Sequence, residues 1–372
     1  MREILKAEMK KCNQADVANK LKTTSPTITR FLNGTQETSL STSLKLIRYL
    51  AKDNEKKFML ELIKEIEKPA NVIIAMEYAS TNYMVKTLKY LLKKFSDTSN
   101  HELKEYLGIY ELIYNWQLRH DGVPVDEQIK KARKLKVTTT EGNIMIKMLE
   151  VYGYFNSAKY NLAYDLAKDL QELVNEMDNE YMKMSITARL SETQSLLALI
   201  LHNDVEQARQ YATATINSKI GKGATAFSHY VLGASYFYED YEKSKMHYEK
   251  AIKIYNKFSE TNSNEVRKEL EFVSAYHLVT GYDYKNEVAK AYSLQNAQNG
   301  SDSILKDLNI NTLSGLEMMF VGELNQDEQM LMQAFTKFIQ EKDMFNANHV
   351  KKTLEGMNVN TMILDNLMSL FA

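Results

Sequence analysis

The side chains that could do metal or covalent chemistry are scattered along this chain. The seven histidines occur singly, without metal-ligand spacing, as His101, His120, His202, His229, His247, His277 and His349. The sequence contains no Gly-rich phosphate loop and no GxSxG, HExxH or CxxC motif. We therefore expect no enzyme, no cofactor and no metal site, and we expect His229 and His247 to form a packed pair.

Hydrogen bonding to nucleic acid is the chemistry that the first 52 residues could provide. Residues 1–52 hold ten Lys or Arg and four Asp or Glu, a charge of +6, so the other 320 residues carry −7 of the total −1. A basic head on an acidic body indicates a polyanionic partner. On charge alone, a solvated surface explains the head equally well.

Two short helices joined by a turn are predicted to position the polar side chains of residues 13–34. The first, 14–22, places Ala15, Val17, Ala18 and Leu21 on one side. The second begins with Ser25 as the capping hydroxyl and Pro26 at the first helical position. Its apolar face is Ile28, Phe31 and Leu32, its outward face is Thr27, Thr29 and Arg30, and Asn33-Gly34 ends it.

This segment resembles the helix-turn-helix of phage repressors, Cro proteins and other Xre-type regulators. The resemblance implies that Asn13 and Gln14 hold a DNA phosphate. It also implies that one set of side chains faces the bases: Ser25, Pro26, Thr27, Thr29 and Arg30. Arg30 could pair with a guanine, and Thr27 suits a phosphate or a thymine methyl group.

Two residues depart from the helix-turn-helix pattern. Lys22 stands where the turn usually has Gly, and Pro26 offers only apolar contact. We expect Lys20, Lys22 and Arg48 to add phosphate contacts. The alternative is a degenerate domain that serves packing or dimerisation.

The rest of the chain is predicted to be helical, because 372 residues contain only three Pro and 13 Gly. Residues 230–254 contain Leu232-Gly233, Tyr236, Tyr241, Ser244, Tyr248 and Ala251. They resemble a tetratricopeptide repeat, in which small residues let paired helices approach closely. Weaker copies run over 149–167, 196–212 and 276–292, with turns at Asn203-Asp204 and Gly281. The predicted fold class is all-α: a helix-turn-helix domain with a linker helix at 1–68, then a TPR-like α-solenoid at 69–372.

The chain end is predicted to join two copies of the protein. Residues 360–372 form an apolar helix where a solenoid normally has a polar cap. We assign dimerisation to Ile363, Leu367, Leu370 and Phe371; folding back onto the last repeat is the alternative. With a single cysteine, Cys12, no apolar leader and no membrane-length apolar run, we expect a cytoplasmic protein of a bacterial host cell that has no membrane partner.

Taken together, the two parts resemble the peptide-sensing RRNPP regulators of Gram-positive bacteria and their phages. Within that group the chain resembles the arbitrium receptor (AimR) family of SPbeta-like Bacillus phages, in stretches that include Glu77-Tyr78-Ala79, Gly108-Ile109-Tyr110 and residues 343–356. The resemblance implies a homodimer that binds a DNA operator and sets the lysis–lysogeny choice in response to a short peptide. A prophage paralogue of the YopK type has the same architecture. The candidate peptide-binding residues are His229, Tyr236, Tyr276, Asp343 and Phe345.

Two functions remain open from the sequence. The first is a dimeric DNA-binding regulator of a phage or prophage, whose partners are a double-stranded operator and, through the solenoid, a short signalling peptide. The second is a solenoid that sequesters another regulatory protein, with little DNA binding of its own.

Overall fold

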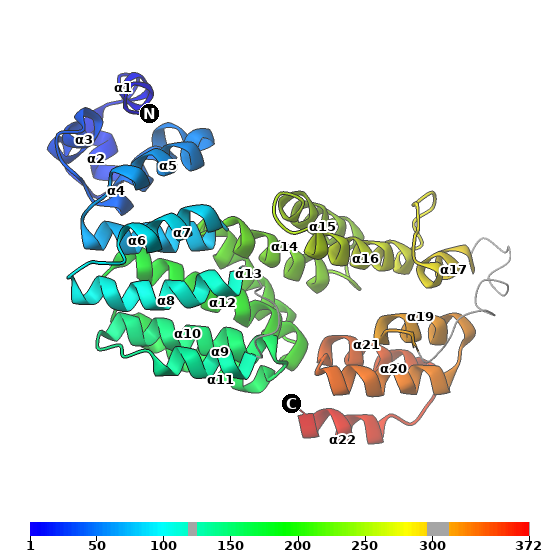
Figure 1. Cartoon of the computed structure of the whole chain (residues 1–372). Coiled ribbons are helices and arrows are strands. Elements are labelled where there is room, and N and C mark those ends of the chain that lie inside the picture. The colour runs from blue at the N-terminus through cyan, green and yellow to red at the C-terminus, as the bar shows by residue number, and fades with distance from the viewer. Residues whose placement is uncertain (118–124, 296–311, 372) are drawn as a thin grey trace. The chain divides into compact units, whose positions relative to one another are not determined.

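The computed structural model describes residues 1–117, 125–295 and 312–371, and every regular element in these ranges is a helix (Figure 1). The all-α prediction is therefore confirmed. The chain divides into two compact units, which we call unit 1 (residues 1–146 and 174–185) and unit 2 (residues 147–173 and 186–372). The functional boundary at 68/69 remains a prediction, because this division follows packing alone.

The first part of unit 1 is a small helical head. Its elements are α1 (Arg2–Met9), α2 (Gln14–Lys20), α3 (Ser25–Asn33), α4 (Leu40–Leu50), the 3-10 helix η1 (Lys52–Asn54) and α5 (Glu55–Glu65). Apolar side chains of these helices form its core, including Leu5, Val17, Ile28, Phe31, Ile47 and Phe58, each at most 4% exposed. Arg2 donates from Nε to the Phe31 carbonyl at 3.3 Å. The Arg2 guanidinium thus binds a carbonyl at the C-terminal end of α3, where the helix dipole favours a cation.

The turn between α2 and α3 differs by one residue from the sequence prediction. Thr24, not Ser25, caps α3, since its side chain accepts from the backbone N–H of Thr27. Pro26 is consequently the second helical residue. Lys22 has φ of +53°, the left-handed conformation expected where relatives of this motif carry Gly, and Gly34 ends α3 with φ of +67°. In α2, Ala15 is exposed and lies off the predicted apolar face.

The second part of unit 1 packs around a helix that is buried on all sides. The elements are α6 (Pro69–Thr81), α7 (Val85–Lys94), α8 (His101–Gln117) and α9 (Val125–Lys134). Every residue of α6 from Asn71 to Thr81 is buried. Its Glu77 carboxylate accepts from Tyr110 at 2.7 Å and from Ser185, so a buried acid joins three helices.

The head is attached to α6 through side-chain hydrogen bonds. The Glu37 carboxylate accepts from the backbone N–H of Glu67 and Lys68 at 3.2 Å and from Asn71 Nδ2 at 2.6 Å. Asn71 Oδ1 in turn accepts from the Leu40 N–H at 2.8 Å. Glu37 therefore lies where the N-terminal dipole of α6 favours an anion.

Three long helices have residues in both units: α10 (Thr140–Asn156), α11 (Tyr160–Val174) and α12 (Glu180–His202). The start of α10 is held by Glu105 of α8, which accepts from the backbone and side chains of Thr138 and Thr139 at 2.7 to 3.2 Å. Burial raises the pKa of Glu105, but these hydrogen bonds outweigh burial and lower it to about 2.

Unit 2 continues as helical hairpins. Its elements are α13 (Val205–Ser218), α14 (Lys222–Ser235), α15 (Tyr241–Tyr255), α16 (Glu260–Tyr276), α17 (Glu287–Gln295), α19 (Gly315–Asn325), α20 (Glu328–Glu341), α21 (Met344–Gly356) and α22 (Met362–Phe371). In the α14–α15 hairpin, Ser244 Oγ donates to the Gly233 carbonyl at 2.8 Å, and a Cβ at Gly233 would lie 2.6 Å from the Tyr248 ring. The predicted small-residue contact is therefore present. The predicted turns also have left-handed residues, Asn203 (φ +51°) and Gly281 (φ +75°).

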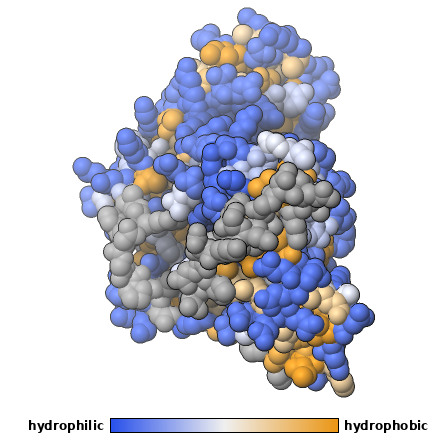
Figure 2. Space-filling view, turned by 90° about the vertical axis from the view of Figure 1, so that its right-hand side faces the viewer, coloured by the Kyte–Doolittle hydropathy of each residue, from blue (hydrophilic) through white to orange (hydrophobic). Residues whose placement is uncertain are grey.

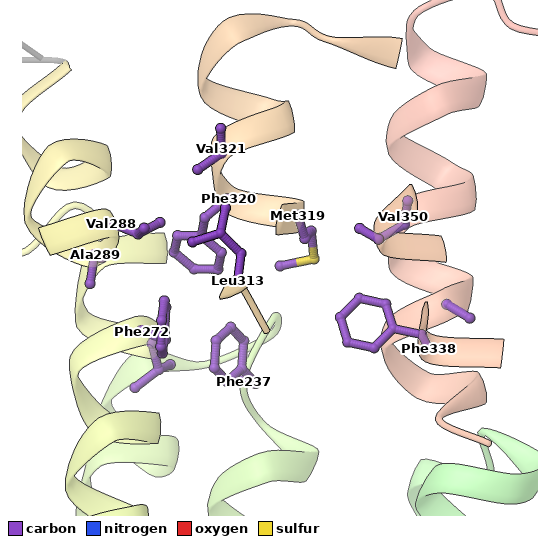
Figure 3. Packing of buried hydrophobic residues seen from close by; sticks show 14 of the residues in the cluster. Phe237, Phe272, Val288, Ala289, Leu313, Met319, Phe320, Val321, Phe338 and Val350 are labelled. Carbon is purple, nitrogen blue, oxygen red and sulfur yellow. The ribbon is translucent and has the colours of Figure 1, made fainter. Parts of the chain in front are cut away.

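Aromatic side chains fill the core between the later hairpins (Figure 3). In α19, Phe320 points toward Val288 and Ala289 of α17, whereas Met319 lies on the side of α19 that faces Phe338 and Val350. The ring centroids of Phe272 and Phe320 are 5.1 Å apart. This shared core joins α16, α17, α19, α20 and α21.

Candidate nucleic-acid interface and ligand cavity

The outward face of α3 carries the predicted base-contacting side chains. Pro26, Thr29 and Arg30 are exposed, whereas Ser25 and Thr27 are half-buried. The opposite face holds Ile28 at 1% exposure, as predicted. The Arg30 guanidinium makes no ion pair within the described residues, so its five donors can reach a ligand.

Asn13 caps the first helix of the motif, and Gln14 connects the two helices. Asn13 Oδ1 accepts from the N–H groups of Ala15 and Asp16 at the start of α2. Gln14 Nε2 donates to the Ser25 carbonyl at 2.8 Å and to Thr29 Oγ1 at 2.9 Å. Gln14 thus fixes α3 against α2, and Thr29 Oγ1 itself donates to the Ser25 carbonyl at 3.1 Å.

The basic side chains beside the motif divide into two kinds. Lys22 is exposed, and Lys20 Nζ lies 4.9 Å from the centre of the Tyr49 ring. Arg48 is bound within the head, because its guanidinium donates to both Glu55 oxygens, at 2.9 and 3.1 Å. The ammonium groups of Lys20 and Lys22 are therefore more open to an anion than the Arg48 guanidinium.

A cavity of about 250 Å³ lies within unit 2, at the turns that follow α12 and α14 and beside α21. Its lining is Asn203, Val205, Ser235, Tyr238, Glu239, Phe345, Asn348, His349 and Lys352. The Tyr238 and His349 rings stack at 3.7 Å, and His349 Nε2 is 3.1 Å from Glu323 Oε1. Of the predicted peptide-binding residues, Phe345 lines this cavity, and Tyr276 packs edge-on against Tyr238 at 5.2 Å.

Two carboxyl groups with raised pKa values lie close to these aromatic residues. Asp343 caps α21 by accepting from the Asn346 N–H at 3.0 Å, and burial raises its pKa to about 6. Burial, with the neighbouring Asp343, raises the pKa of Glu269 to about 7. Burial, and then the negative charges of Glu269 and Asp343, raise the pKa of the Tyr230 hydroxyl. A cationic group would lower both carboxyl pKa values and bind favourably there.

The two other predicted peptide-binding residues meet at a different place, between α14 and α15. The Nδ1 atoms of His229 and His247 are 3.0 Å apart, the packed pair that the sequence predicted. Tyr236 stacks parallel to His247 at 6.2 Å, and the Arg209 guanidinium lies 3.6 Å from the Tyr236 ring centre. The five candidates thus form two groups: Tyr276, Asp343 and Phe345 near Tyr238, and His229 and Tyr236 near His247.

The C-terminal helix α22 has one face on unit 2 and one face outward. Leu364 is 1% exposed, and Leu367 and Met368 pack against the unit 2 core. Met362 and Ile363 are 70% and 69% exposed, and hydrophobic side chains gather at the foot of Figure 2, where α22 lies. Ile363 is therefore free on the surface, whereas Leu367, one turn later on the same side of the helix, is half-buried against the unit 2 core. The side chains of Leu370 and Phe371 lie outside the described residues, as does His120.

Neither metal-binding clusters nor membrane-length helices were found in the described ranges. No group of three or more His, Cys, Asp or Glu there could hold a metal ion. No helix there is both long and apolar enough to cross a membrane.

Residues 53–355 match the AimR transcriptional regulator-like family. The chain belongs to this family. AimR-like proteins are transcriptional regulators, not enzymes. The match begins after α4, so most of the head lies outside it.

Individual relatives of the AimR-like chain are distant. The chain is 23% identical over 186 residues to the AimR transcriptional regulator of Bacillus phage SPbeta and to the SPbeta prophage-derived uncharacterized protein YopK of Bacillus subtilis. These alignments cover 48% of this chain, and the chain spans about half the length (46%) of either relative. An AimR transcriptional regulator of Bacillus phage phi3T is 21% identical over 56% of this chain and 54% of the relative.

Solved AimR structures share the fold. The phAimR structure covers 99% of both chains with a TM-score of 0.77 at 19% identity. A structure titled phAimR-Ligand covers 87% of this chain and 98% of that one, with a TM-score of 0.66 at 20% identity. The head followed by a TPR-like solenoid is therefore the fold of this chain from end to end.

Sequence reasoning missed several residues of the cavity. Tyr238 and His349 are its central pair, yet only their neighbours Tyr236 and Phe345 were singled out. His349 follows Phe345 by four residues, so helical spacing places both on one face, a signal that could have found it. Glu269, which lies near Asp343 and outside the cavity lining, carried no such signal, because only folding brings these two acids together.

Proposed function

We propose that this chain is a dimeric DNA-binding regulator of a phage or prophage that controls the lysis–lysogeny choice. The observation that carries the proposal is the outward face of α3, where Thr29 and Arg30 are exposed on a basic head and Arg30 makes no ion pair with any residue that the structure describes. Membership of a transcriptional-regulator family supports it. In this proposal α3 enters the major groove of an operator, Arg30 contacts a guanine, and Lys20 and Lys22 contact phosphates.

The test is selection of bound fragments from sheared host and prophage DNA at near-physiological salt. Wild type is compared with Thr27→Ala/Arg30→Ala and with Arg267→Ala, an exposed arginine of α16. We expect wild type and Arg267→Ala to recover the same paired half-sites and the double variant to lose them. With the recovered operator, Arg30→Ala alone should cost about 1–3 kcal/mol and relax preference at one base pair.

The opposite result favours the other function. If wild type and the double variant both recover only the same mixture of DNA fragments, bound in a salt-sensitive way, α3 does not recognise a DNA sequence. Sequestration of a protein partner by the solenoid would then be the better explanation.

We further propose that unit 2 binds a short peptide bearing a positive charge, at the cavity lined by Tyr238, Phe345 and His349. The carboxyl groups of Asp343 and Glu269 do not line this cavity, but both act electrostatically on Tyr238. The aromatic lining suits peptide side chains, and the acids suit an amine or guanidinium. The relative titled phAimR-Ligand supports a ligand site in this fold.

Proton release tests this peptide proposal. Both carboxyl pKa values are near neutrality, so a bound cation should displace protons at pH 6 to 7. Short synthetic peptides retained by the protein are titrated calorimetrically in buffers of different ionisation enthalpy. Asp343→Asn should weaken binding and reduce proton release, whereas Leu162→Ala, an exposed apolar position of α11, should do neither. Binding without proton release, or with Asp343→Asn unaffected, would refute the site.

A further inference from the structure

Helix α7 has a lysine face that contributes nothing to the packing of unit 1. Leu88 and Leu91 are fully buried and attach the helix to its neighbours. Lys86, Lys89 and Lys93 are exposed on the opposite side. They recur at i, i+3 and i+7, which places all three on one face of the helix.

The charge of this face is not balanced by ion pairs within the part of the chain that the structure describes. The sequence of α7, VKTLKYLLKK, contains four lysines and no acid. The fourth, Lys94, is neutralised internally, since its ammonium donates to Glu67 at 2.7 Å and to the Ile66 carbonyl at 3.0 Å. The ammonium groups of Lys86, Lys89 and Lys93 make no ion pair among the described residues. Only these three lysines of α7 remain for an external anion.

The lysine face begins beside the head. Lys94 also approaches the Lys64 carbonyl at 3.5 Å, so the end of α7 adjoins the end of α5. Both helices belong to unit 1. The end of the lysine face at Lys93 therefore lies close to the end of α5, the last helix of the head, and the face extends along α7 to Lys86.

We propose that the α7 lysine face binds the phosphate backbone of the duplex that flanks the half-site read by α3. This inference rests on the proposed DNA-binding function and extends its footprint. Seven residues of helix span about 10.5 Å, and phosphates on one strand recur every 3.4 Å or so along the duplex axis. Three lysines on this span match a short run of phosphates. The exposed Tyr90 between them adds a hydroxyl that can donate to phosphate oxygen.

The α7 face suits a polyanion rather than a membrane. A helix that lies on a lipid surface inserts an apolar face, and the apolar face of α7 is buried in unit 1. Lysine contacts to phosphate carry no sequence information, so α7 should add affinity and salt dependence without altering base preference.

The test compares Lys86→Gln/Lys89→Gln/Lys93→Gln with Lys250→Gln/Lys253→Gln/Lys257→Gln. The control triplet has the same spacing and is also exposed, but it lies in and just after α15. The probe is the duplex that wild type selects from a random-sequence pool. It is prepared in two lengths, trimmed to the protected base pairs and extended by one helical turn on each side.

For the extended duplex, the α7 variant should bind more weakly, and its log–log salt slope should fall by up to about 3 per protomer. The control variant should match wild type, and repeated selection with the α7 variant should return the wild-type sequence. An unchanged affinity and salt slope on the extended duplex would overturn the inference while leaving the proposed function intact. Failure of wild type to select any sequence would overturn the proposed function and this inference with it.

Discussion

At the residue scale, the pair formed by His229 and His247 makes the stability of unit 2 depend on pH. Burial, followed by the charge of Lys250, lowers the pKa of His229 to about 4; burial, then His229, lowers that of His247 to about 4. The usual value is 6.5, so the folded chain binds these protons less readily than the unfolded chain. The folded state is therefore stabilised as long as both histidines are neutral. This contribution is complete above about pH 6.5 and declines as the pH falls from there toward 4.

The prediction is that His229→Phe/His247→Phe weakens this dependence. Two Nδ1 atoms 3.0 Å apart can share one proton, and a second proton would place two N–H groups against each other. The unfolding free energy, measured by urea denaturation at pH 7 and pH 5, should fall less in the double variant than in wild type. His202→Gln removes an exposed histidine and should keep the wild-type difference. An equal decline in all three proteins would contradict the assignment.

The inward and outward sides of α3 could be predicted, because they depend only on the spacing of residues along one helix. Ile28 and Phe31 lie inward and Arg30 outward, as expected from one helical period. The N-cap of α3 is Thr24, one residue before the predicted Ser25. The sequence could not decide between them, because both carry suitable hydroxyls and Pro is tolerated at either of the first two helical positions. The partner of Arg48 could not be predicted, since the Glu55 carboxylate reaches it only after η1 turns the chain.

At the element scale, the α14–α15 hairpin depends on a missing side chain. A Cβ at Gly233 would lie 2.6 Å from the fully buried Tyr248 ring, which has no room to move. Gly233→Ala should therefore lower the unfolding free energy by about 1–3 kcal/mol, despite the higher helix preference of Ala. Gly356→Ala is the matched control, because nothing lies within 4 Å of its Cβ position. It should leave the urea midpoint unchanged or raise it slightly; equal effects of the two substitutions would contradict close packing at Gly233.

The elements of the solenoid were predictable to different degrees. The hairpin of residues 230–254 combines small and large residues at repeat spacing, and this local pattern specified its packing. The cavity was only partly predictable, because Tyr276 and Phe345 reach Tyr238 from α16 and α21, far apart in the chain. The curvature that brings such helices together comes from many small packing angles, which no short motif encodes.

At the scale of the whole molecule, α22 presents an apolar surface that we expect a second copy to cover. Leu364 anchors the helix on the unit 2 core, which leaves Met362 and Ile363 about 70% exposed. Two-fold pairing of identical patches is the commonest way to bury such a surface. A dimer would also supply two heads for the two half-sites of an operator.

The prediction is that Ile363→Glu shifts the protein from dimer to monomer, because the pairing would bury two like charges. Sedimentation velocity over a range of concentrations measures the shift. Leu162→Glu introduces the same charge at an apolar side chain of α11 that is 52% exposed, and should sediment as wild type. The monomeric variant should lose far more affinity for a duplex with two half-sites than for one with a single half-site, because the second head no longer binds from the same molecule. Unchanged sedimentation of Ile363→Glu would place the dimer contact elsewhere, whereas loss of the dimer with unchanged two-site affinity would mean that each head binds the operator independently.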